Sequence, residues 1–449
     1  MTEQTSGEIT VGIDIGTTSV KAVAADADGK IVARARVPHE LRIPRPDLFE
    51  HVAEEAWARG PVAALAQLGG VDPVGVSVAA MIPSLVAVDD SGTPITPGLL
   101  YGDARGRANS ASSTDESGEF REFLAWTAAQ APHARGYWPA QSVANYALSG
   151  TPILDTTTAV TAYPLFDFVG WDEELVAEAG ARPDQLPTIA PSGQPAGHVG
   201  DAVLEPGTID ALAEQFVAGA DSVGDVLVIC GTTLIVWVVV ESEREVPGYL
   251  CVPHSSPGLW LVGGPSNAGG LFLDWVQRLL GVRGGSPENA SEGVSVDPSA
   301  VPVWAPYLRG ERAPLHKPDL RGELVDLDLT HGPGTVLRAA FEATGFATRR
   351  LIEAAGVRPN RIVASGGGTR VDGWMQALAD ATTLPVDAVA VPEGGALGAA
   401  FFARVAAGLE AAATDASRWA RTGRRVDPDL RWTEAMARRY ERFMSFVSL

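Results

Sequence analysis

A short motif occurs twice in the chain and constrains the fold more than any other feature. The first copy reads GIDIGTTSVKAVAAD from Gly12, and the second reads VICGTTLIVWVVV from Val228. In each copy an apolar run leads into Gly-Thr-Thr and out into a second apolar run, which predicts a tight hairpin of two buried strands. The repetition indicates a duplicated domain with a cleft between the two halves.

The turn of each hairpin has residues that suit phosphate binding. The first turn is Gly16, Thr17 and Thr18, and the second is Gly231, Thr232 and Thr233. Glycine lets the backbone approach an oxyanion closely, turn N–H groups point at it, and threonine hydroxyls add donors. Neither turn is a P-loop or a dinucleotide fingerprint, because a strand rather than a helix follows. One such turn alone would be an ordinary hairpin, but two copies favour phosphate binding.

Carboxylates close to these motifs are candidates for chemistry. Asp14 precedes the first turn, where the second copy has Ile229. A buried carboxylate needs a partner, and Mg²⁺ beside nucleotide phosphates or the turn N–H groups would supply one. Lys21 on the second strand could meet a phosphate or lie exposed. Asp210 begins a helical pattern, so it is either an N-cap or a general base at a helix N-terminus.

Two further sites have weaker signals. Gly366, Gly367 and Gly368 lie between a predicted strand and a predicted helix, which suits close packing against a flat ring or a phosphate. Asp103 and Arg105 lie in LLYGDARG. Such a pair is usually a surface salt bridge, although a carboxylate oriented by arginine is also a natural acceptor for neighbouring sugar hydroxyls. The histidines and cysteines show no metal-ligand spacing, and no Ser/His/Asp signature is present.

Composition limits the partners. The 449 residues suffice for two or three domains, and 55 acidic against 34 basic residues give a net charge of −21. A surface this negative repels phosphate backbones and acidic headgroups, so we expect neither nucleic acid nor a membrane as partner. There are two cysteines, the N-terminus lacks a signal-peptide pattern, and the apolar run over 226–240 is too short for a membrane span. These features predict a cytoplasmic protein.

The remaining segments carry coarser expectations. We expect a helix over 52–68, an insertion or cap over 106–200, a polar surface loop over 281–299, and helices over 335–355, 374–382 and 395–409. From residue 414 onward the composition predicts a charged helical segment.

The order of these motifs resembles that of the FGGY carbohydrate kinases of the actin/hexokinase superfamily, and most resembles their xylulokinase-like branch. Besides the two hairpins, PYLRGERAPLHKPDLRGELVDL resembles the family's PYLxGERxPxxDPxxRG stretch. GTIDALAEQF resembles its catalytic-aspartate segment. IVASGGGTRVDGWMQALADATTLPV followed by EGGALGAAFFA resembles its adenosine-binding region. The resemblance covers nearly the whole chain.

The resemblance implies an α/β fold with two ribonuclease-H-like domains around a cleft. The expected division is an N-terminal domain over 9–225, a C-terminal domain over 226–412 and a helical segment over 413–449. The implied activity is ATP-dependent phosphorylation of a small sugar, a ketopentose such as xylulose, with ATP and Mg²⁺ bound and a homodimer permitted.

The resemblance also implies roles for particular residues. Asp210 matches the catalytic base and Asp14 the aspartate that works with Mg²⁺. The turn 231–233 matches the γ-phosphate turn, the glycines 366–368 the adenosine site, and Asp103 a sugar-binding aspartate. Asp221, in AGADSVGD, is a rival base, but it lies too close to Gly231 and is expected in the loop before the strand.

The sequence departs from the xylulokinase pattern in three places. The WNDxR-type segment is here YGDARG. The Gln-Met-His-Gly segment near the sugar is replaced by AAMIPSL around Met81, which makes that wall more apolar. The stretch HVGDAVLEPGTID before Asp210 lacks the family's usual helix and Pro-Val strand. These departures motivate two alternatives, a non-catalytic actin-like nucleotide sensor and a kinase for another polyol or a non-sugar acceptor.

Overall fold

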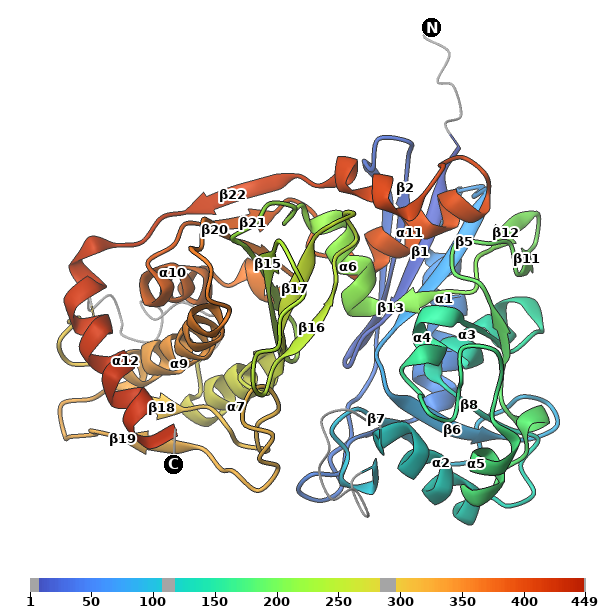
Figure 1. Ribbon diagram of the computed structural model, residues 1–449, viewed down its shortest axis with the longest axis horizontal. Helices are drawn as coiled ribbons and strands as arrows, with labels where there is room; N and C mark the ends of the chain where they lie inside the picture. Colours follow the sequence, from blue (N-terminus) through green and yellow to red (C-terminus); the bar gives the residue numbers. More distant parts are fainter. Residues whose placement is uncertain (1–7, 107–117, 283–295, 448–449) are drawn as a thin grey trace, which may run out of the picture. The chain divides into compact units, whose positions relative to one another are not determined.

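The computed structural model describes residues 8–106, 118–282 and 296–447. The chain divides into two compact units (Figure 1). Unit 1 comprises Met1–Val217 and Glu393–Trp419, and unit 2 comprises Ala218–Pro392 and Ala420–Leu449. Each unit is therefore assembled from two stretches that lie far apart in the sequence.

Unit 1 is built on a mixed sheet with the strand order β11-β12-β5-β1-β2-β3, in which β13 also pairs with β5. β1 is antiparallel to β2 and parallel to β5. β1 and β5 are buried along their whole length, whereas β3 alternates between partly buried and exposed residues, as expected for central and outer strands. The strands are β1 (Thr10–Ile15), β2 (Ser19–Ala25), β3 (Ile31–Pro38), β5 (Gly75–Ala80), β11 (Gly197–Val199), β12 (Ala202–Leu204) and β13 (Thr208–Ile209).

Helix α11 (Gly394–Ala406) packs unusually close to this sheet because small residues meet at the contact. A Cβ atom built on Gly12 of β1 would lie 1.8 Å from the carbonyl oxygen of Ala396, and one on Gly75 of β5 would lie 2.7 Å from that of Ala403. The expected Ala-rich helix over 395–409 is thus confirmed. The other helices of this part of unit 1 are α1 (Gly60–Gln67), preceded by a π-helical turn (Glu54–Arg59), α3 (Ala140–Ser149) and α6 (Asp210–Ala218).

The rest of unit 1 forms a second region with its own apolar cluster, which includes Phe123, Tyr137 and Leu165. Most of the stretch 106–200, predicted as an insertion or cap, lies here. Its sheet has the order β4-β7-β6-β8, and β9 pairs with β10. The elements are β4 (Glu50–His51), β6 (Ser84–Val88), β7 (Gly98–Leu100), α2 (Gly118–Gln130), β8 (Gly136–Trp138), β9 (Ile153–Asp155), α4 (Thr156–Val160), α5 (Glu173–Glu178) and β10 (Thr188–Ala190).

Unit 2 has a sheet in the order β16-β17-β15-β14-β20-β21-β22 and a separate β18–β19 pair. The strands are β14 (Asp225–Cys230), β15 (Leu234–Val240), β16 (Leu250–Pro253), β17 (Trp260–Ser266), β18 (Val303–Ala305), β19 (Glu323–Val325), β20 (Arg361–Ser365), β21 (Val386–Val389) and β22 (Thr422–Val426). The helices are α7 (Gly270–Leu280), α9 (Pro333–Ala354), α10 (Asp372–Thr382) and α12 (Thr433–Val447). Both predicted Gly-Thr-Thr hairpins, β1–β2 and β14–β15, are confirmed.

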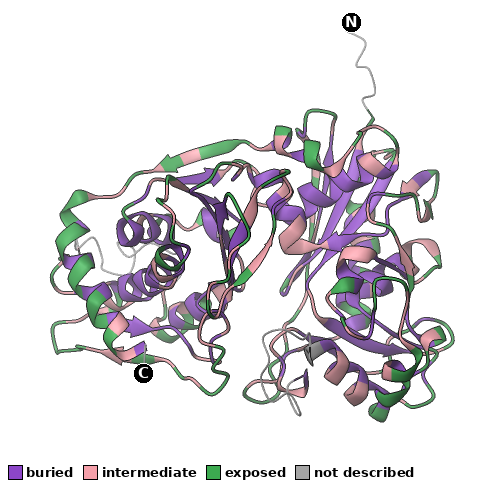
Figure 2. Cartoon of the chain, in the orientation of Figure 1, coloured by how far each residue is buried: buried purple, intermediate pink, exposed green. Residues whose placement is uncertain are grey.

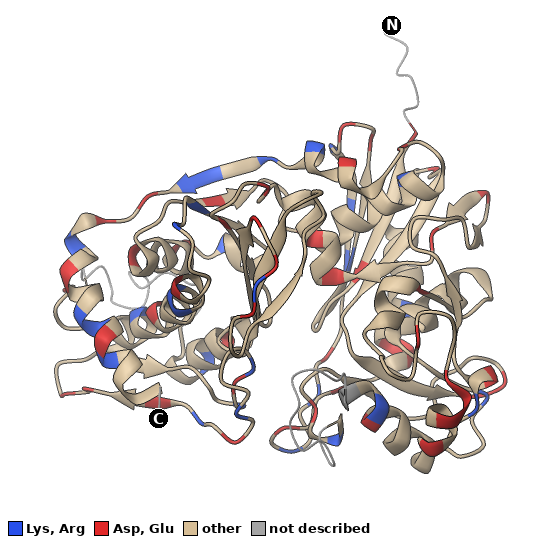
Figure 3. Ribbon diagram, viewed as in Figure 1, with Lys and Arg blue, Asp and Glu red and all other residues tan. Residues whose placement is uncertain are grey.

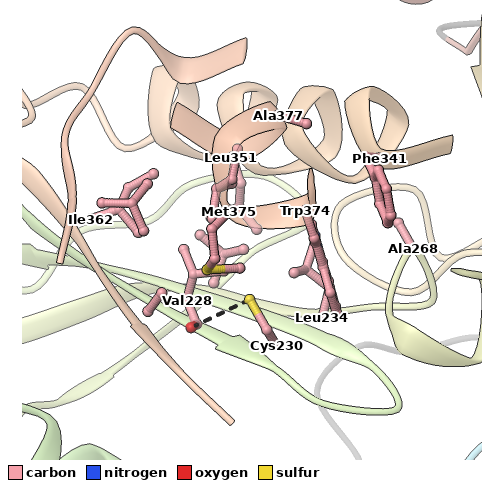
Figure 4. Close-up of a cluster of buried hydrophobic side chains, with 14 of the residues drawn as sticks. Val228, Cys230, Leu234, Ala268, Phe341, Leu351, Ile362, Trp374, Met375 and Ala377 are labelled. Atoms are coloured by element: carbon pink, nitrogen blue, oxygen red, sulfur yellow. Dashed lines mark hydrogen bonds between the residues drawn. The ribbon is translucent and has the colours of Figure 1, made fainter. Parts of the chain in front are cut away.

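The core of unit 2 lies where α9 and α10 cover the sheet. Figure 4 shows Val228 and Cys230 of β14 pointing toward Met375 and Trp374 of α10. The central strands and these two helices are buried, whereas most exposed residues lie in loops and outer elements (Figure 2). Burial of a large apolar side chain contributes about 1.5–3 kcal/mol, so this layer stabilises the sheet edge at which the second turn lies.

Two expectations about the chain's organisation differ from the structure. The segment from residue 413 is not helical throughout, because Thr422–Val426 forms β22 antiparallel to β21. This outer strand carries Arg424 and Arg425, visible as a basic strand in Figure 3, and its polar sequence gives no strand signal. The predicted break at residues 412/413 also differs from the compact units, because Glu393–Trp419 packs with the N-terminal sheet. Most of the predicted loop 281–299 (residues 283–295) lies outside the described residues.

Candidate active site

The first Gly-Thr-Thr turn is fixed from several sides within unit 1. The Tyr101 hydroxyl lies 2.9 Å from the Thr17 hydroxyl oxygen, and the His51 ring nitrogen Nε2 donates to the Thr17 carbonyl at 2.8 Å. Trp57 donates to the other ring nitrogen of His51, so His51 is held as the neutral imidazole, and burial lowers its pKa to about 3. Thr17 is buried and Thr18 is exposed. The turn is therefore rigid at Thr17 and open at Thr18.

Asp14 lies at the end of β1, where the hairpin register places it opposite Lys21. The Lys21 amine is 3.0 Å from Asp14 Oδ2, so Lys21 is a partly buried ion-pair partner rather than an exposed strand lysine. The charge of Asp14 raises the pKa of Lys21. The other carboxylate oxygen, Asp14 Oδ1, is buried and has no hydrogen-bond partner.

The start of α11 lies against the same carboxylate. A Cβ atom on Gly395 would lie 3.1 Å from Asp14 Cγ, and one on Gly394 would lie 2.6 Å from Glu214 Cγ. Two glycines at the helix start therefore leave room around acidic groups. The described residues contain no cluster of three metal-ligating side chains. Mg²⁺ retains several waters and is commonly held by one or two carboxylates together with phosphates, so the unpartnered Asp14 oxygen fits such an ion.

The pairing of β1 and β13 with β5 places Asp210 beside Asp14. Asp14 pairs in register with Ala79 of β5, and Ile209 of β13 pairs with Ala80, the next residue of the same strand. Helix α6 begins at Asp210, as predicted, and Asp210 Oδ1 accepts a hydrogen bond from Ala211 N–H at 2.7 Å.

The environment of Asp210 favours a carboxyl group that can exchange a proton near neutral pH. Burial, followed by the negative charge of Asp14, raises its pKa to about 6, while Lys21 acts in the opposite direction. Its surface is nevertheless partly exposed. A carboxylate with this pKa and access is suited to act as a general base.

The rival aspartate has a different environment. Asp221 lies in unit 2, in the loop before β14, as expected. Its Oδ1 is 3.8 Å from Nε2 of His254, and the same ring nitrogen donates to the Ala220 carbonyl. Asp221 is thus part of a loop anchor, and unit 1, which holds Asp14, does not contain it.

The second turn is held in unit 2 by the start of α7. Gly270 N–H donates to the Gly231 carbonyl at 2.8 Å, and Leu271 N–H donates to the Thr232 carbonyl at 3.0 Å. A Cβ atom on Gly269 would lie 2.3 Å from the carbonyl carbon of Thr233, so the helix start and the turn are in backbone contact. Thr233 is buried, and Gly231 and Thr232 are partly exposed.

The glycine triplet lies next to this second turn because β20 is parallel to β14. A Cβ atom on Gly366 would lie 2.9 Å from the Cys230 carbonyl oxygen, and one on Gly368 would lie 2.2 Å from the Trp374 ring. A Cβ atom on Gly367 would meet nothing within 4 Å, and this residue is exposed. Gly366 and Gly368 therefore have no room for a side chain, whereas the backbone of Gly367 is open at the surface.

The predicted sugar-side residues prove to be more buried than a surface pair. Asp103 is fully buried and accepts hydrogen bonds from Phe49 N–H and from the backbone and guanidinium of Arg105. Arg105 also bonds Glu50 at 3.0 Å and lies 4.9 Å from the centre of the Trp126 ring. Met81 is buried at 2% exposure. The surface salt-bridge alternative for Asp103 is therefore wrong.

Sequence reasoning missed two groups of this site. Tyr101 and His51, which hold the first turn, carry no motif and reach Thr17 only through the fold. Glu214 could have been found, because it lies four residues after Asp210 on the same helix and therefore on the same face. Both Asp210 and Glu214 contribute to the raised pKa of Lys21.

Comparison with known proteins identifies the family of the chain. The N-terminal domain model of the FGGY family of carbohydrate kinases matches residues 9–123, and the C-terminal domain model matches residues 226–407. The chain belongs to the FGGY family of carbohydrate kinases. The predicted enzyme class, a phosphotransferase that acts on sugar hydroxyls, is thereby confirmed.

Curated relatives match most of the chain but differ in the substrate that their names state. Xylulose kinase from Klebsiella pneumoniae is 26% identical over 89% of this chain and 90% of its own length. Gluconokinase from Bacillus subtilis (strain 168) is 24% identical over 82% of both chains. Glycerol kinase from Renibacterium salmoninarum is 26% identical over 95% of this chain and 94% of its own length.

Solved structures confirm the fold. The xylulose kinase from Rhodospirillum rubrum matches with a TM-score of 0.74 and 27% identity, covering 98% of each chain. The gluconate kinase from Lactobacillus acidophilus matches with a TM-score of 0.77 and 21% identity, covering 98% of this chain and 97% of its own. The predicted two-domain actin-like fold is confirmed. None of the helices in the described ranges is long and apolar enough to cross a bilayer.

Proposed function

We propose that the protein transfers the γ-phosphoryl group of ATP to a hydroxyl of a small neutral sugar, a ketopentose such as xylulose, in the cytoplasm. In this proposal Asp210 accepts the proton of the attacking hydroxyl, and the Thr17–Thr18 and Thr232–Thr233 turns donate to phosphate oxygens. The observation that carries the proposal is the strand register that places partly buried Asp210 beside Asp14, whose Oδ1 has no hydrogen-bond partner. Burial and the charge of Asp14 also raise the pKa of Asp210 to about 6.

Asp14 is the residue that would hold Mg²⁺, and the ion would supply neutralisation of charge on the phosphates. The residues of the chain do the rest. Lys21 offsets the charge of Asp14 through its 3.0 Å ion pair. The open face of the first turn at Thr18 leaves N–H groups available to an anion. Phosphoryl transfer depends chiefly on positioning and charge stabilisation, which these rigid turns are suited to supply.

The proposal of a neutral sugar rests on the charges near Asp103. Two carboxylates, Asp103 and Glu50, surround the single guanidinium of Arg105, and both bond it. Arg105 is therefore already neutralised and has no strong attraction for the carboxylate of a sugar acid. This balance favours a ketose over gluconate.

The hypothesis of a non-catalytic sensor rests on the altered sugar wall around Met81 and on the stretch before Asp210. The structure forms this stretch as β12 and β13, both of which pair with β5, so the strand thought to be lacking is present in two pieces. Nothing in this geometry separates Asp210 from Asp14, and we retain the kinase as the proposed function.

The function is tested by ADP release with Mg-ATP and a panel of ketopentoses, aldopentoses, gluconate, glycerol and hexuloses. We expect the highest kcat/KM with a ketopentose and at least about tenfold lower kcat/KM with gluconate, since one unfavourable charge contact costs about 1.4 kcal/mol or more. A preference for gluconate would contradict the charge argument. Clear ATP binding without turnover on any acceptor would favour the sensor instead.

The proposed nucleotide site predicts that a substitution at Gly367 weakens ATP binding without disturbing the fold. Replacing Gly367 by Val should leave the fold intact, because a Cβ atom there meets nothing within 4 Å. If the triplet receives the adenosine, the added side chain occupies its approach and should weaken ATP binding about tenfold or more. Isothermal titration with a non-hydrolysable ATP analogue measures this, and Gly332→Val is a matched control in the same unit, since its surroundings are also open. Equal ATP affinity in both variants would remove Gly367 from the nucleotide site.

A further inference from the structure

The strand that delivers Asp210 contains one extra residue. Leu204 of β12 pairs with Val76 of β5, and Thr208 of β13 pairs with Ala79 of the same strand. Between these two pairs the chain advances by four residues, from Leu204 to Thr208, whereas β5 advances by three, from Val76 to Ala79. Such bulges re-aim a side chain, and a shift of register by one residue moves side chains to the opposite face of a sheet. The direction in which the Asp210 side chain points thus depends on the position of this extra residue in the chain.

The carboxyl group of Glu205 holds the first part of the bulge. Glu205 is fully buried, and its Oε1 accepts from Gly193 N–H at 2.8 Å. Its Oε2 accepts from Gly207 N–H at 2.7 Å and lies 2.6 Å from the Ser77 hydroxyl of β5. One side chain therefore connects the bulge, the neighbouring loop and the central strand.

Two amides hold the carbonyl of Pro206, which lies within the bulge. Gln141 Nε2 and Asn145 Nδ2, both on α3, each donate to the Pro206 carbonyl at 2.8 Å. Each amide also donates to a second acceptor, Gln141 to Asp155 Oδ1 at 3.1 Å and Asn145 to the Ile153 carbonyl at 3.1 Å, and these acceptors together set the orientation of both amides. This orientation leaves Gln141 Oε1 and Asn145 Oδ1 buried without a partner. Unpartnered buried oxygens are costly, so the orientation is retained at some expense of stability.

The extra residue is accommodated at Gly207, which has φ +111°. A Cβ atom there would lie 1.9 Å from Gln141 Nε2 and 2.5 Å from the Val78 carbonyl oxygen. The bulge and the three side chains around it therefore fit one another closely, and Asp210 follows three residues later.

We propose that Glu205, together with Gln141 and Asn145, is a positioning set that fixes the bulge before Asp210 and thereby aims the catalytic carboxylate. The proposal rests on the proposed role of Asp210 as base. None of the three side chains touches the reacting atoms in this scheme. They act through the backbone of residues 205–209, which has no other side-chain anchor of this kind among the described contacts.

The sharpest test is Glu205→Gln. In either protonation state of Glu205, Oε2 can accept from Gly207 N–H, because the Ser77 hydroxyl can either donate or accept. A glutamine side chain has one accepting oxygen, so either Gly193 N–H or Gly207 N–H loses its acceptor. We expect kcat to fall roughly 10- to 100-fold, as for small misplacements of a reacting group, with KM for ATP changed less than about twofold.

Gln141→Met is the second variant, because it keeps the side-chain length and removes the donor to Pro206, together with the donor to Asp155 Oδ1. Gln185→Met is its matched control. Gln185 is equally buried in unit 1 and donates to the Ala134 carbonyl at 2.8 Å, outside the proposed site. We expect Gln141→Met to lower kcat at least about tenfold. The control should show a similar loss of thermal stability with nearly unchanged kcat. An equal kcat loss in both, or normal kcat in Glu205→Gln, would overturn the proposal.

Amide hydrogen exchange separates this proposal from the proposed function. A peptide covering 203–210 should exchange about tenfold faster in Glu205→Gln and in Gln141→Met than in the wild type, and this readout needs no turnover. If the wild type phosphorylates no acceptor, the proposed function fails while the exchange result still decides whether the bulge is fixed by these side chains. Unchanged exchange in both variants would overturn the positioning set.

Discussion

Replacing Asp210 by Asn is expected to lower kcat for sugar phosphorylation by about 10³-fold, within the usual range for loss of a general base. The amide has nearly the same shape and cannot accept the hydroxyl proton. ATP binding should persist, because Gly231–Thr233 and Gly366–Gly368 lie in unit 2 and do not depend on the Asp210 charge. Single-turnover rates and ATP titration measure the two effects separately.

The same substitution should stabilise the protein at neutral pH. Asp210 has a pKa of about 6 in the fold against 3.8 for an unperturbed aspartate, so its ionised form is disfavoured by folding. The folded state therefore loses stability as pH rises from about 4 to 6, and Asn removes this loss. Because the side chain is partly exposed, we expect a gain of about 1–2 kcal/mol at pH 7 and none at pH 3. Urea unfolding at both pH values measures this.

The pH profile provides the third part of this prediction. The wild-type rate should fall below about pH 6 as Asp210 becomes protonated, and a cation beside Asp14 would move this limb to lower pH. Asp221→Asn is the matched control, because it removes the rival carboxylate in unit 2 and should leave kcat within about threefold of wild type. Substantial turnover in Asp210→Asn, or loss of turnover in Asp221→Asn, would show that Asp210 is not the general base.

Replacing Gly12 by Ala is expected to cost about 3 kcal/mol or more, at the upper end for overpacking of a core. The new methyl group would lie 1.8 Å from the Ala396 carbonyl oxygen and 2.4 Å from the Ala400 nitrogen. Both are backbone atoms of α11, so no side chain can rotate away. The helix has little room to shift, because Gly398 meets Ala213 of α6 with a built Cβ distance of only 2.0 Å.

Urea unfolding measures the effect of Gly12→Ala, and Gly170→Ala is the control in the same unit, since a Cβ atom there meets nothing within 4 Å. A soluble Gly12→Ala protein with wild-type stability would show that α11 does not pack as closely as described. Where the variant is stable enough to assay, turnover should fall as well, because the start of α11 lies against Asp14.

Much of the site could be predicted because its signals are local. The β1–β2 and β14–β15 hairpins follow from apolar runs around Gly-Thr-Thr, and the start of α6 at Asp210 follows from the residue types that favour helix N-termini. The choice of Asp210 over Asp221 came from the resemblance to the family, and the pKa of Asp210 supports it.

The parts that could not be predicted depend on contacts between distant residues. Burial of Asp103 arises from Phe49 and Arg105 closing over it, and a sequence window shows only an ordinary ion pair. β22 forms because β21 offers an open edge, although Thr-Gly-Arg-Arg-Val has little strand character. The bulge at Gly207 is a matter of register against β5, which local sequence does not reveal.

The interleaved chain path affects how the protein is synthesised. Unit 1 needs Glu393–Trp419, and unit 2 needs Ala420–Leu449, so unit 1 stays incomplete until long after its first strands have been translated. At about 5–20 residues per second, the N-terminal sheet waits on the order of ten seconds or more without α11 to cover β1 and β5. During that interval an apolar face of the nascent chain is open to other nascent chains and to chaperones. The translation of Glu393–Trp419 thus decides when the first strands of the chain can be covered.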